Sequence, residues 1–411
     1  MMVEDKILNF EKMGLGLFIH WGLYAHFAEG EWAQNILEVP DYSQAFTRFN
    51  PDPKKIRQWV TLAKQNGFKY IVLTAKHHDG FYLFDTTKGI SEFDSMRTPF
   101  KADVIKIFVD ECHRQGVAPF LYFATYDWHN PKYTADFPGY LAELRQLIRL
   151  LATNYGEIGG FWFDGNWDKP DADWQTDQLY SEIRQLQPQA MITNNTGLEQ
   201  QGVNQGEAVD VLTFERGNPQ NIKHEQHGLY FAAETSMTLN RHWGNAENDL
   251  DYVAARQLIE QICQSRKVGA NLLINIGPQF DGSVNLPSQA LLELVGKWMQ
   301  VNGTAITATA NKAHPTYIAE NNDKNFIKGD YLFVTGLQNI GNHNVVLGGE
   351  QAQKIIFQGQ VPQQKIKQIV WLDNGESVDF QQSSDELKIL ADSFRYGTHL
   401  VVRVAQITFV D

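Results

Sequence analysis

Three acidic side chains of this 411-residue chain stand at the ends of short apolar runs. Asp164 ends GGFWFD, Glu215 ends DVLTFE and Glu234 ends LYFAAE. An aspartate followed by glycine after a strand is also a common turn former, so Asp164 alone does not indicate catalysis. Two carboxylates that face each other across a polar pocket, however, can cleave a glycosidic bond. One attacks or stabilises the anomeric carbon, and the other protonates the departing oxygen.

Histidine and tyrosine side chains also lie at or near the ends of apolar runs. His20 follows GLGLFI, His77 and His78 follow KYIVLTAK, and Tyr122 lies within VAPFLYFA. Imidazole groups could donate hydrogen bonds to the hydroxyls of a sugar, and an indole offers a flat apolar surface to its C–H face. The tryptophans available for this second role are Trp32, Trp128, Trp162 and Trp243.

A metal-dependent hydrolase is the rival interpretation of the same side chains. His20, the His-His-Asp run at 77–79 and Asp164 could supply zinc ligands. Adjacent residues of an extended segment point to opposite sides, so one of the two histidines could bind a metal without a turn, but not both. The two cysteines, Cys112 and Cys263, show no C-x-x-C spacing. The sequence therefore favours a site without a metal ion.

The elements that would position these groups are eight short apolar runs separated by helix-like segments. The segment 53–67, for example, has apolar residues at helical spacing, Pro53 at its start and Gly67 at its end. Such alternation predicts a (β/α)8 barrel, whose active site lies at the carboxyl ends of its strands. Little room remains for helices between the fifth, sixth and seventh runs, so some are expected to be short or missing. The eight runs are 14–21, 69–76, 117–124, 159–165, 190–195, 210–215, 229–234 and 270–277.

The pattern changes after about residue 310. Strand-like alternation replaces helical spacing in segments such as 330–337, 366–375 and 398–410. This predicts a catalytic barrel over residues 1–310 and a C-terminal antiparallel β-sandwich over 311–411.

The composition limits the partners and the location of the protein. A formal net charge of −13 argues against nucleic acid. No run of eighteen apolar residues is present, so no membrane partner is expected. The N-terminal residues MMVEDKILNFEKMGLG carry charges where a signal peptide needs an apolar segment, which favours a cytoplasmic protein. Assembly into an oligomer is compatible with the sequence.

Seven motifs resemble those of the alpha-L-fucosidases of glycoside hydrolase family 29, and they occur in the same order. They cover roughly residues 14 to 290. The motifs are GLFIHWG, GEW, KYIVLTAKHHDGF, DWHNPKY, GFWFDG, ETSMTLNRHWG and NLLINIGP.

The resemblance implies a retaining exo-alpha-L-fucosidase that removes terminal fucose by double displacement, without a metal or organic cofactor. Asp164 matches the family nucleophile, and Trp162 would line the pocket. The 6-methyl group of fucose needs an apolar niche, for which Trp21, Phe81, Trp162 and Trp243 are candidates. The residues that match positions holding fucose hydroxyls are His20, Glu31, Trp32, His77, His78 and Tyr122.

The resemblance leaves the catalytic acid/base open between Glu215 and Glu234. Glu215 is preferred because the loop that follows it can reach the leaving group. Many relatives carry an arginine where this chain has Thr196, and Arg216 or Arg241 could serve in its place. The absence of a signal peptide suggests a bacterial cytoplasmic enzyme acting on short fucosylated oligosaccharides. The alternatives are a metal-dependent hydrolase and a fucose-binding lectin on the same barrel.

Overall fold

The computed structural model describes residues 3–38, 42–86, 89–204, 206, 208–310, 315–337 and 352–410. The chain forms two compact units. One comprises Met1–Val253 and Ala270–Glu293, and the other comprises Ala254–Gly269 and Leu294–Asp411. The second unit thus takes in two chain segments that precede residue 311, where the sequence predicts the domain boundary.

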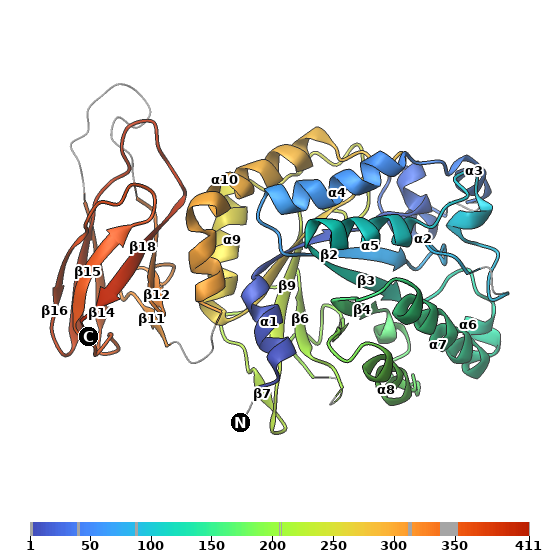
Figure 1. Ribbon diagram of the computed structural model, residues 1–411, viewed down its shortest axis with the longest axis horizontal. Helices are drawn as coiled ribbons and strands as arrows, with labels where there is room; N and C mark the ends of the chain where they lie inside the picture. Colours follow the sequence, from blue (N-terminus) through green and yellow to red (C-terminus); the bar gives the residue numbers. More distant parts are fainter. Residues whose placement is uncertain are drawn as a thin grey trace. The chain divides into compact units, whose positions relative to one another are not determined.

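Eight parallel strands of the first unit close into a barrel, as the sequence predicts (Figure 1). Nearly every residue of these strands is buried, which explains why the runs are continuously apolar rather than alternating. In order around the barrel the strands are β1 (Leu15–Ile19), β10 (Asn271–Ile276), β9 (Ala232–Thr238), β6 (Val211–Glu215), β5 (Met191–Asn194), β4 (Gly160–Asp164), β3 (Ala118–Ala124) and β2 (Tyr70–Lys76).

Long helices follow β1 to β4, and aspartate side chains cap the first turns of the first three, α4, α5 and α7. Asp52 accepts a hydrogen bond from the backbone of Lys54 ahead of α4, and Asp103 accepts one from Lys106 in α5. The helices of the first unit are α1 (Asp5–Met13), α2 (Ala33–Ile36), α3 (Ser43–Arg48), α4 (Pro53–Gln65), α5 (Val104–Gln115), α6 (Lys132–Ala135), α7 (Phe137–Asn154) and α8 (Thr176–Leu186), with 3-10 turns η1 (Leu23–His26), η2 (Ser95–Arg97) and η3 (Asn166–Asp168).

The expected shortage of helices is confirmed after β5 and β6. Between β5 and β6 the described residues contain no helix, and between β6 and β9 the chain forms a small hairpin of β7 (Glu225–Gln226) and β8 (Leu229–Tyr230). Long loops therefore leave the carboxyl ends of these two strands. Helices α9 (Ala255–Val268) and α10 (Leu286–Ala308) follow β9 and β10. No described helix is both long and apolar enough to cross a membrane.

Large aromatic side chains fill the interior of the barrel. At the amino ends of the strands, the ring of Phe10 on α1 lies 5.3 Å from Tyr70 and 5.8 Å from Phe120. Further along, Phe18, Tyr122 and Trp162 pack together, and Trp162 stacks on Tyr122 at 5.6 Å. This packing closes the barrel below its upper rim, so the rim can hold a pocket but not a channel.

The C-terminal strands of the second unit form the predicted sandwich of two antiparallel sheets. Its core takes apolar residues from both sheets, among them Ile327, Phe357 and Ile389. The five-stranded sheet has the order β11 (Thr316–Ile318), β12 (Phe326–Lys328), β13 (Tyr331–Thr335), β18 (Val402–Phe409) and β15 (Ile366–Trp371), and the three-stranded sheet the order β14 (Gln353–Gln358), β17 (Glu386–Ala391) and β16 (Asp379–Gln382).

Candidate active site

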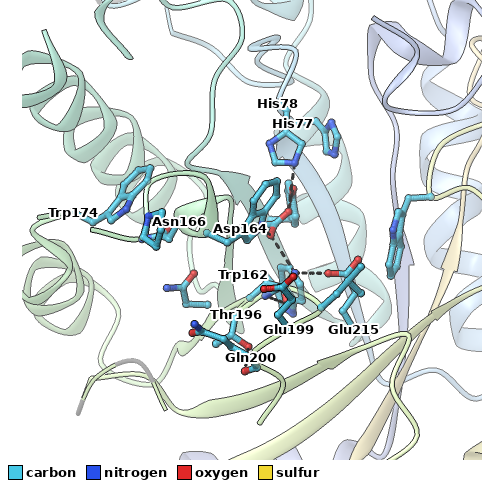
Figure 2. A pocket seen from close by; sticks show the side chains of 18 of the residues that line it. His77, His78, Trp162, Asp164, Asn166, Trp174, Thr196, Glu199, Gln200 and Glu215 are labelled. Atoms are coloured by element: carbon cyan, nitrogen blue, oxygen red, sulfur yellow. Dashed lines mark hydrogen bonds and ion pairs between the residues drawn. The ribbon is translucent and has the colours of Figure 1, made fainter. Parts of the chain in front are cut away.

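A cavity of about 920 Å³ opens at the carboxyl ends of β1 to β6. Most of the polar side chains that the sequence places at strand ends meet there (Figure 2). The predicted site residues that line it are His20, Trp32, His77, His78, Tyr122, Trp162, Asp164, Glu215 and Trp243.

Asp164 lies in the pocket as the last residue of β4 and has hydrogen-bond donors around both carboxylate oxygens. Tyr122 donates to Oδ2 at 2.8 Å, and Nε2 of His78 lies 3.5 Å from the same oxygen. The indole of Trp167 donates to Oδ1 at 2.9 Å, and the amide of Asn195 donates to Oδ1 at 3.1 Å. The geometry is that of an ionised carboxylate held in one orientation.

The hydrogen bonds determine the protonation state of Asp164. Burial by itself would raise the pKa of this carboxyl group, but the bonds from His78, Trp167 and Tyr122 outweigh it and lower the pKa to about 2. Asp164 therefore carries a full negative charge at neutral pH.

Glu215, the last residue of β6, has the opposite protonation behaviour. Burial and the nearby charge of Asp164 raise its pKa to about 7, although a hydrogen bond from Asn195 acts against them. A substantial fraction of Glu215 is therefore protonated at neutral pH and can donate a proton. Two carboxyl groups with opposite protonation states in one pocket suit an acid and a nucleophile.

Asn195 connects the two carboxyl groups directly. Its amide nitrogen lies 3.1 Å from Oδ1 of Asp164 and 2.8 Å from Oε2 of Glu215. Because both oxygens contact the same atom, they are at most about 6 Å apart. In Figure 2, dashed contacts reach the labelled side chains of Asp164 and Glu215.

Two histidines of the pocket, His20 and His77, are uncharged at neutral pH. Burial lowers the pKa of His20 to about 3, although a hydrogen bond to Asn275 at 2.7 Å acts in the opposite direction. Burial also lowers the pKa of His77, and the neighbouring His78 adds to the effect. Neutral imidazoles can both donate and accept hydrogen bonds, which suits recognition of hydroxyl groups.

Aromatic rings form the apolar walls. Trp32 lies 5.3 Å from His78 and stacks near Trp167 at 6.3 Å, whereas Trp243 lies 5.0 Å from His20 and 5.8 Å from Phe18. Two of the four candidates for the apolar niche, Trp162 and Trp243, line the pocket. The other two candidates for that niche are elsewhere. Trp21 packs on Trp59 of α4, Phe81 packs on Phe49, and neither lines the pocket.

Glu234 does not stand at a strand end. It is the third residue of β9, which continues to Thr238. The apolar run ends earlier than the strand, because the strand residues Thr235, Ser236 and Thr238 are polar although they are buried. Its carboxylate accepts hydrogen bonds from the hydroxyl of Tyr70 and, at 2.9 Å, from the indole of Trp162. Glu234 thus lies beneath Trp162, is not among the residues that line the pocket, and supports the pocket floor.

Glu31 also lies outside the pocket lining, in contrast to the sequence prediction. It is buried, and its carboxylate accepts hydrogen bonds from the backbone nitrogens of Trp243 at 3.0 Å and Gly244 at 2.8 Å. Its position is explained by these two donors, which hold it against the loop that carries Trp243. Glu31 therefore positions a pocket wall.

Thr196, where the resemblance leads to the expectation of an arginine, lines the pocket, and its hydroxyl donates to the carbonyl of Gln200 at 2.6 Å. Neither of the proposed substitutes lines the pocket. The guanidinium of Arg216 lies 5.2 Å from the ring of Trp243, beside the wall, and Arg241 pairs with Asp251 at 2.6 Å.

Sequence reasoning assigned no role to Asn195, Asn166, Trp167, Trp174 or the residues 197–200, all of which line the pocket. The signal for Trp167 is the sequence DGNW. Gly165 has φ 105, and a Cβ there would lie 2.6 Å from the backbone nitrogen of Tyr126. This turn leads into η3 and returns the Trp167 indole to Asp164. The Asp164-Gly165 pair thus forms a turn and also places the Asp164 carboxylate in the pocket.

The metal alternative finds no support in the described ranges, where no group of three or more His, Cys, Asp or Glu side chains is arranged to hold a metal ion. The carboxylate of Asp79 accepts a hydrogen bond from the backbone of Phe81 and lines a different cavity.

Comparisons with known proteins agree with this geometry. The family model described as alpha-L-fucosidase matches residues 5–304. Plasma alpha-L-fucosidase of Homo sapiens is 26% identical over 334 residues, which cover 73% of this chain and 69% of the relative. Alpha-L-fucosidase isoenzyme 1 from Paenibacillus thiaminolyticus is similar in structure, with a TM-score of 0.82, 28% identity and 99% of both chains covered.

A second solved structure supports the same fold. An alpha-L-fucosidase from Bacteroides thetaiotaomicron superposes with a TM-score of 0.80 at 23% identity, covering 99% of this chain and 95% of that chain. The family model alone spans well over half of the sequence, and the chain therefore belongs to the alpha-L-fucosidase family of glycoside hydrolases.

Proposed function

We propose that this enzyme is a retaining exo-alpha-L-fucosidase that removes terminal alpha-linked L-fucose from short oligosaccharides by double displacement. The observation that carries the proposal is the pair Asp164 and Glu215, linked by Asn195, with one carboxyl group ionised and the other partly protonated at neutral pH. Their separation of at most about 6 Å supports retention, since inverting enzymes hold their carboxyl groups farther apart to admit a water molecule.

In the first step, a carboxylate oxygen of Asp164 forms a bond to the anomeric carbon while the bond from that carbon to the leaving oxygen breaks. Glu215 transfers its proton to the leaving oxygen. The ester formed on Asp164 no longer carries the negative charge that helps to raise the pKa of Glu215. The acidity of Glu215 therefore increases after the first step, and its carboxylate becomes available as a base.

In the second step, Glu215 accepts a proton from water as the water oxygen bonds to the anomeric carbon. The ester bond breaks and returns Asp164 to its ionised form. A retaining route of this kind agrees with a relative from Bacteroides thetaiotaomicron whose solved structure is described as a trapped covalent intermediate in complex with 2-fluoro-fucosyl fluoride.

The deep part of the pocket suits a single terminal deoxy sugar. His20, His77 and the hydroxyl of Tyr122 offer hydrogen-bonding groups to sugar hydroxyls, while Trp162 and Trp243 offer apolar surface for the 6-methyl group. Because the aromatic core closes the barrel below these residues, a chain end can enter the pocket but a polymer cannot thread through it.

The test is hydrolysis of para-nitrophenyl alpha-L-fucoside, with the first-formed anomer of fucose identified by NMR. We expect wild type to release alpha-L-fucose first, and Asp164→Ala to lose at least about 10⁴-fold in kcat because the nucleophile is gone. Asp171→Ala, a carboxylate of the same segment outside the pocket lining, is the control. Release of the beta anomer first would contradict double displacement, and fucose binding without turnover would indicate a lectin.

A further inference from the structure

The residues that line the pocket divide into a buried floor and an exposed rim. Phe18, His20, His77, Tyr122 and Asp164 are buried. The rim comes from the segment after β4 and the loop after β5, and its exposed members are Pro170, Asp173, Leu198, Glu199 and Gln200. If fucose occupies the floor, as the proposed function requires, the leaving group that Glu215 protonates must emerge among the rim residues.

The rim carries two negative charges. Asp173 accepts a hydrogen bond from the backbone of Gln175 at 2.9 Å, which is a local turn contact. Across the described ranges, no Lys or Arg forms an ion pair with Asp173 or Glu199. Among the described residues, the pocket lining includes Asp164 and Glu215 as well but no Lys or Arg. An arriving leaving group therefore meets several carboxylates, of which Glu215 also feels the positive charge of Arg216.

Arg145 donates to the side-chain carbonyl of Gln175 at 2.6 Å, in the rim segment. Two further cations lie near the pocket. Arg216 lies beside the wall that Trp243 forms, where its guanidinium covers the ring of Trp243 and donates to the carbonyl of Arg241 at 2.8 Å. Lys169 belongs to the rim segment, but its ammonium lies over the rings of Tyr133 at 4.7 Å and Phe137 at 5.7 Å. Neither is among the residues that line the pocket.

Uncharged contacts are available on the same rim. Trp174 lines the pocket, and Figure 2 shows Trp174 and Asn166 on one side of Asp164, with Glu215 on the other. Leu198 exposes 64% of its surface, and Gln200 offers an amide. An indole, an isobutyl group and an amide match the C–H face and the hydroxyls of a neutral sugar.

We infer that this pocket selects fucosides with an uncharged leaving group and discriminates against anionic ones, such as uronic acids and sialylated or sulfated sugars, through Asp173 and Glu199. The inference rests on the proposed function. It concerns the charge of the leaving group. A negative leaving group is repelled by Asp173 and Glu199 at short range, and salt screens this repulsion. The formal net charge of −13 acts in the same direction during approach.

The test uses two disaccharides that differ at one position, an alpha-L-fucosyl galactoside and the corresponding alpha-L-fucosyl galacturonoside with the same linkage. For wild type at low salt we expect kcat/KM for the neutral disaccharide to exceed that for the acid by on the order of fivefold. This ratio should fall towards one in 0.5 M NaCl, because the Debye length is then only about 4 Å.

Substitutions at the rim test whether Asp173 and Glu199 cause the preference for the neutral disaccharide. In Glu199→Gln and Asp173→Asn the ratio should fall by about twofold each, and in the double variant it should approach one. Asp110→Asn on the outer helix α5, which neutralises an exposed carboxylate that pairs with Lys106, should leave the ratio at the wild-type value. The salt dependence of wild type provides the same test if a variant fails to fold.

Equal cleavage of the two disaccharides by wild type, or a ratio unaffected by both rim substitutions, would overturn the inference. Either result leaves the proposed function standing, since the neutral disaccharide is still cleaved. Failure to cleave any fucoside, para-nitrophenyl alpha-L-fucoside included, would instead contradict the proposed function itself.

Discussion

At the scale of single residues, the chemistry depends on two carboxyl groups that accept hydrogen bonds from the same amide but have different protonation states. Asn195 donates to both Asp164 and Glu215, but the remaining surroundings of the two groups differ. Asp164 has further donors in Tyr122 and Trp167, whereas Glu215 is partly buried and lies beside the charge of Asp164. Hydrogen bonding therefore keeps one group ionised, and burial with repulsion keeps the other protonated.

This difference predicts how activity depends on pH. Glu215 must be protonated in the free enzyme and its pKa is raised to about 7, so kcat/KM should fall above about pH 7, by tenfold for each further unit. Asp164 must be ionised and its pKa is lowered to about 2, so no acid limb from this group should appear above pH 4. The measurement is kcat/KM for a natural fucosyl disaccharide from pH 4 to 9.

Glu215→Gln provides the control for the assignment. With para-nitrophenyl alpha-L-fucoside, whose leaving group needs little protonation, this variant should retain much more of the wild-type formation of the intermediate than with the disaccharide. Its profile should also lack the basic limb. A basic limb that persists in Glu215→Gln would assign the titration, and the acid role, to another group.

At the scale of elements, strand β9 determines which glutamate can be the acid. Glu234 precedes the end of this strand by four residues, so its carboxylate lies inside the barrel and bonds to Tyr70 and Trp162. Glu215 ends β6 and reaches the pocket. The position of each residue along its strand, rather than its chemical type, separates a catalytic group from one that supports the floor.

The buried position of Glu234 predicts a pH-dependent stability difference. Burial raises its pKa to about 7 from an ordinary value of 4.5, although the bonds from Tyr70 and Trp162 act against the shift. The folded state thus binds more protons than the unfolded state between about pH 4.5 and 7, and the stability contributed by this group is lost as pH rises through that window. Relative to wild type, Glu234→Gln should gain about 3 kcal/mol in unfolding free energy between pH 4 and pH 8.

Urea unfolding at several pH values measures this gain, with Glu29→Gln, an exposed carboxylate, as the control. The activity of Glu234→Gln should remain within about tenfold of wild type, because Glu234 touches the pocket only through Trp162. A stability difference independent of pH would refute the raised pKa. Loss of activity with azide rescue would make Glu234 the acid/base.

At the scale of the whole molecule, the eight apolar runs predict the barrel because strands buried on both faces cannot alternate in polarity. The same rule fails at β9, where Thr235 and Ser236 are buried polar residues that extend the strand past Glu234. Periodicity also could not find Glu31, whose role depends on a contact with Gly244 more than two hundred residues away. The loops after β4 and β5 carry no periodic signal, so the rim of the pocket appears only in three dimensions.

The cytoplasmic location, the bacterial origin and the possibility of an oligomer stay predictions, as does the division of the chain at residue 311. The relatives come from animals as well as bacteria. Both cysteines, Cys112 and Cys263, are free and buried.

The central claim is that Asp164 forms a covalent bond to fucose. The most direct measurement is mass spectrometry of the enzyme after incubation with 2-fluoro-fucosyl fluoride, followed by peptide mapping, with Asp164→Asn as the control. The account predicts one 2-fluoro-fucosyl group per chain, attached to the peptide that contains Asp164 and absent from the variant. A label on another carboxyl group, or turnover of this reagent without any covalent label, would contradict it.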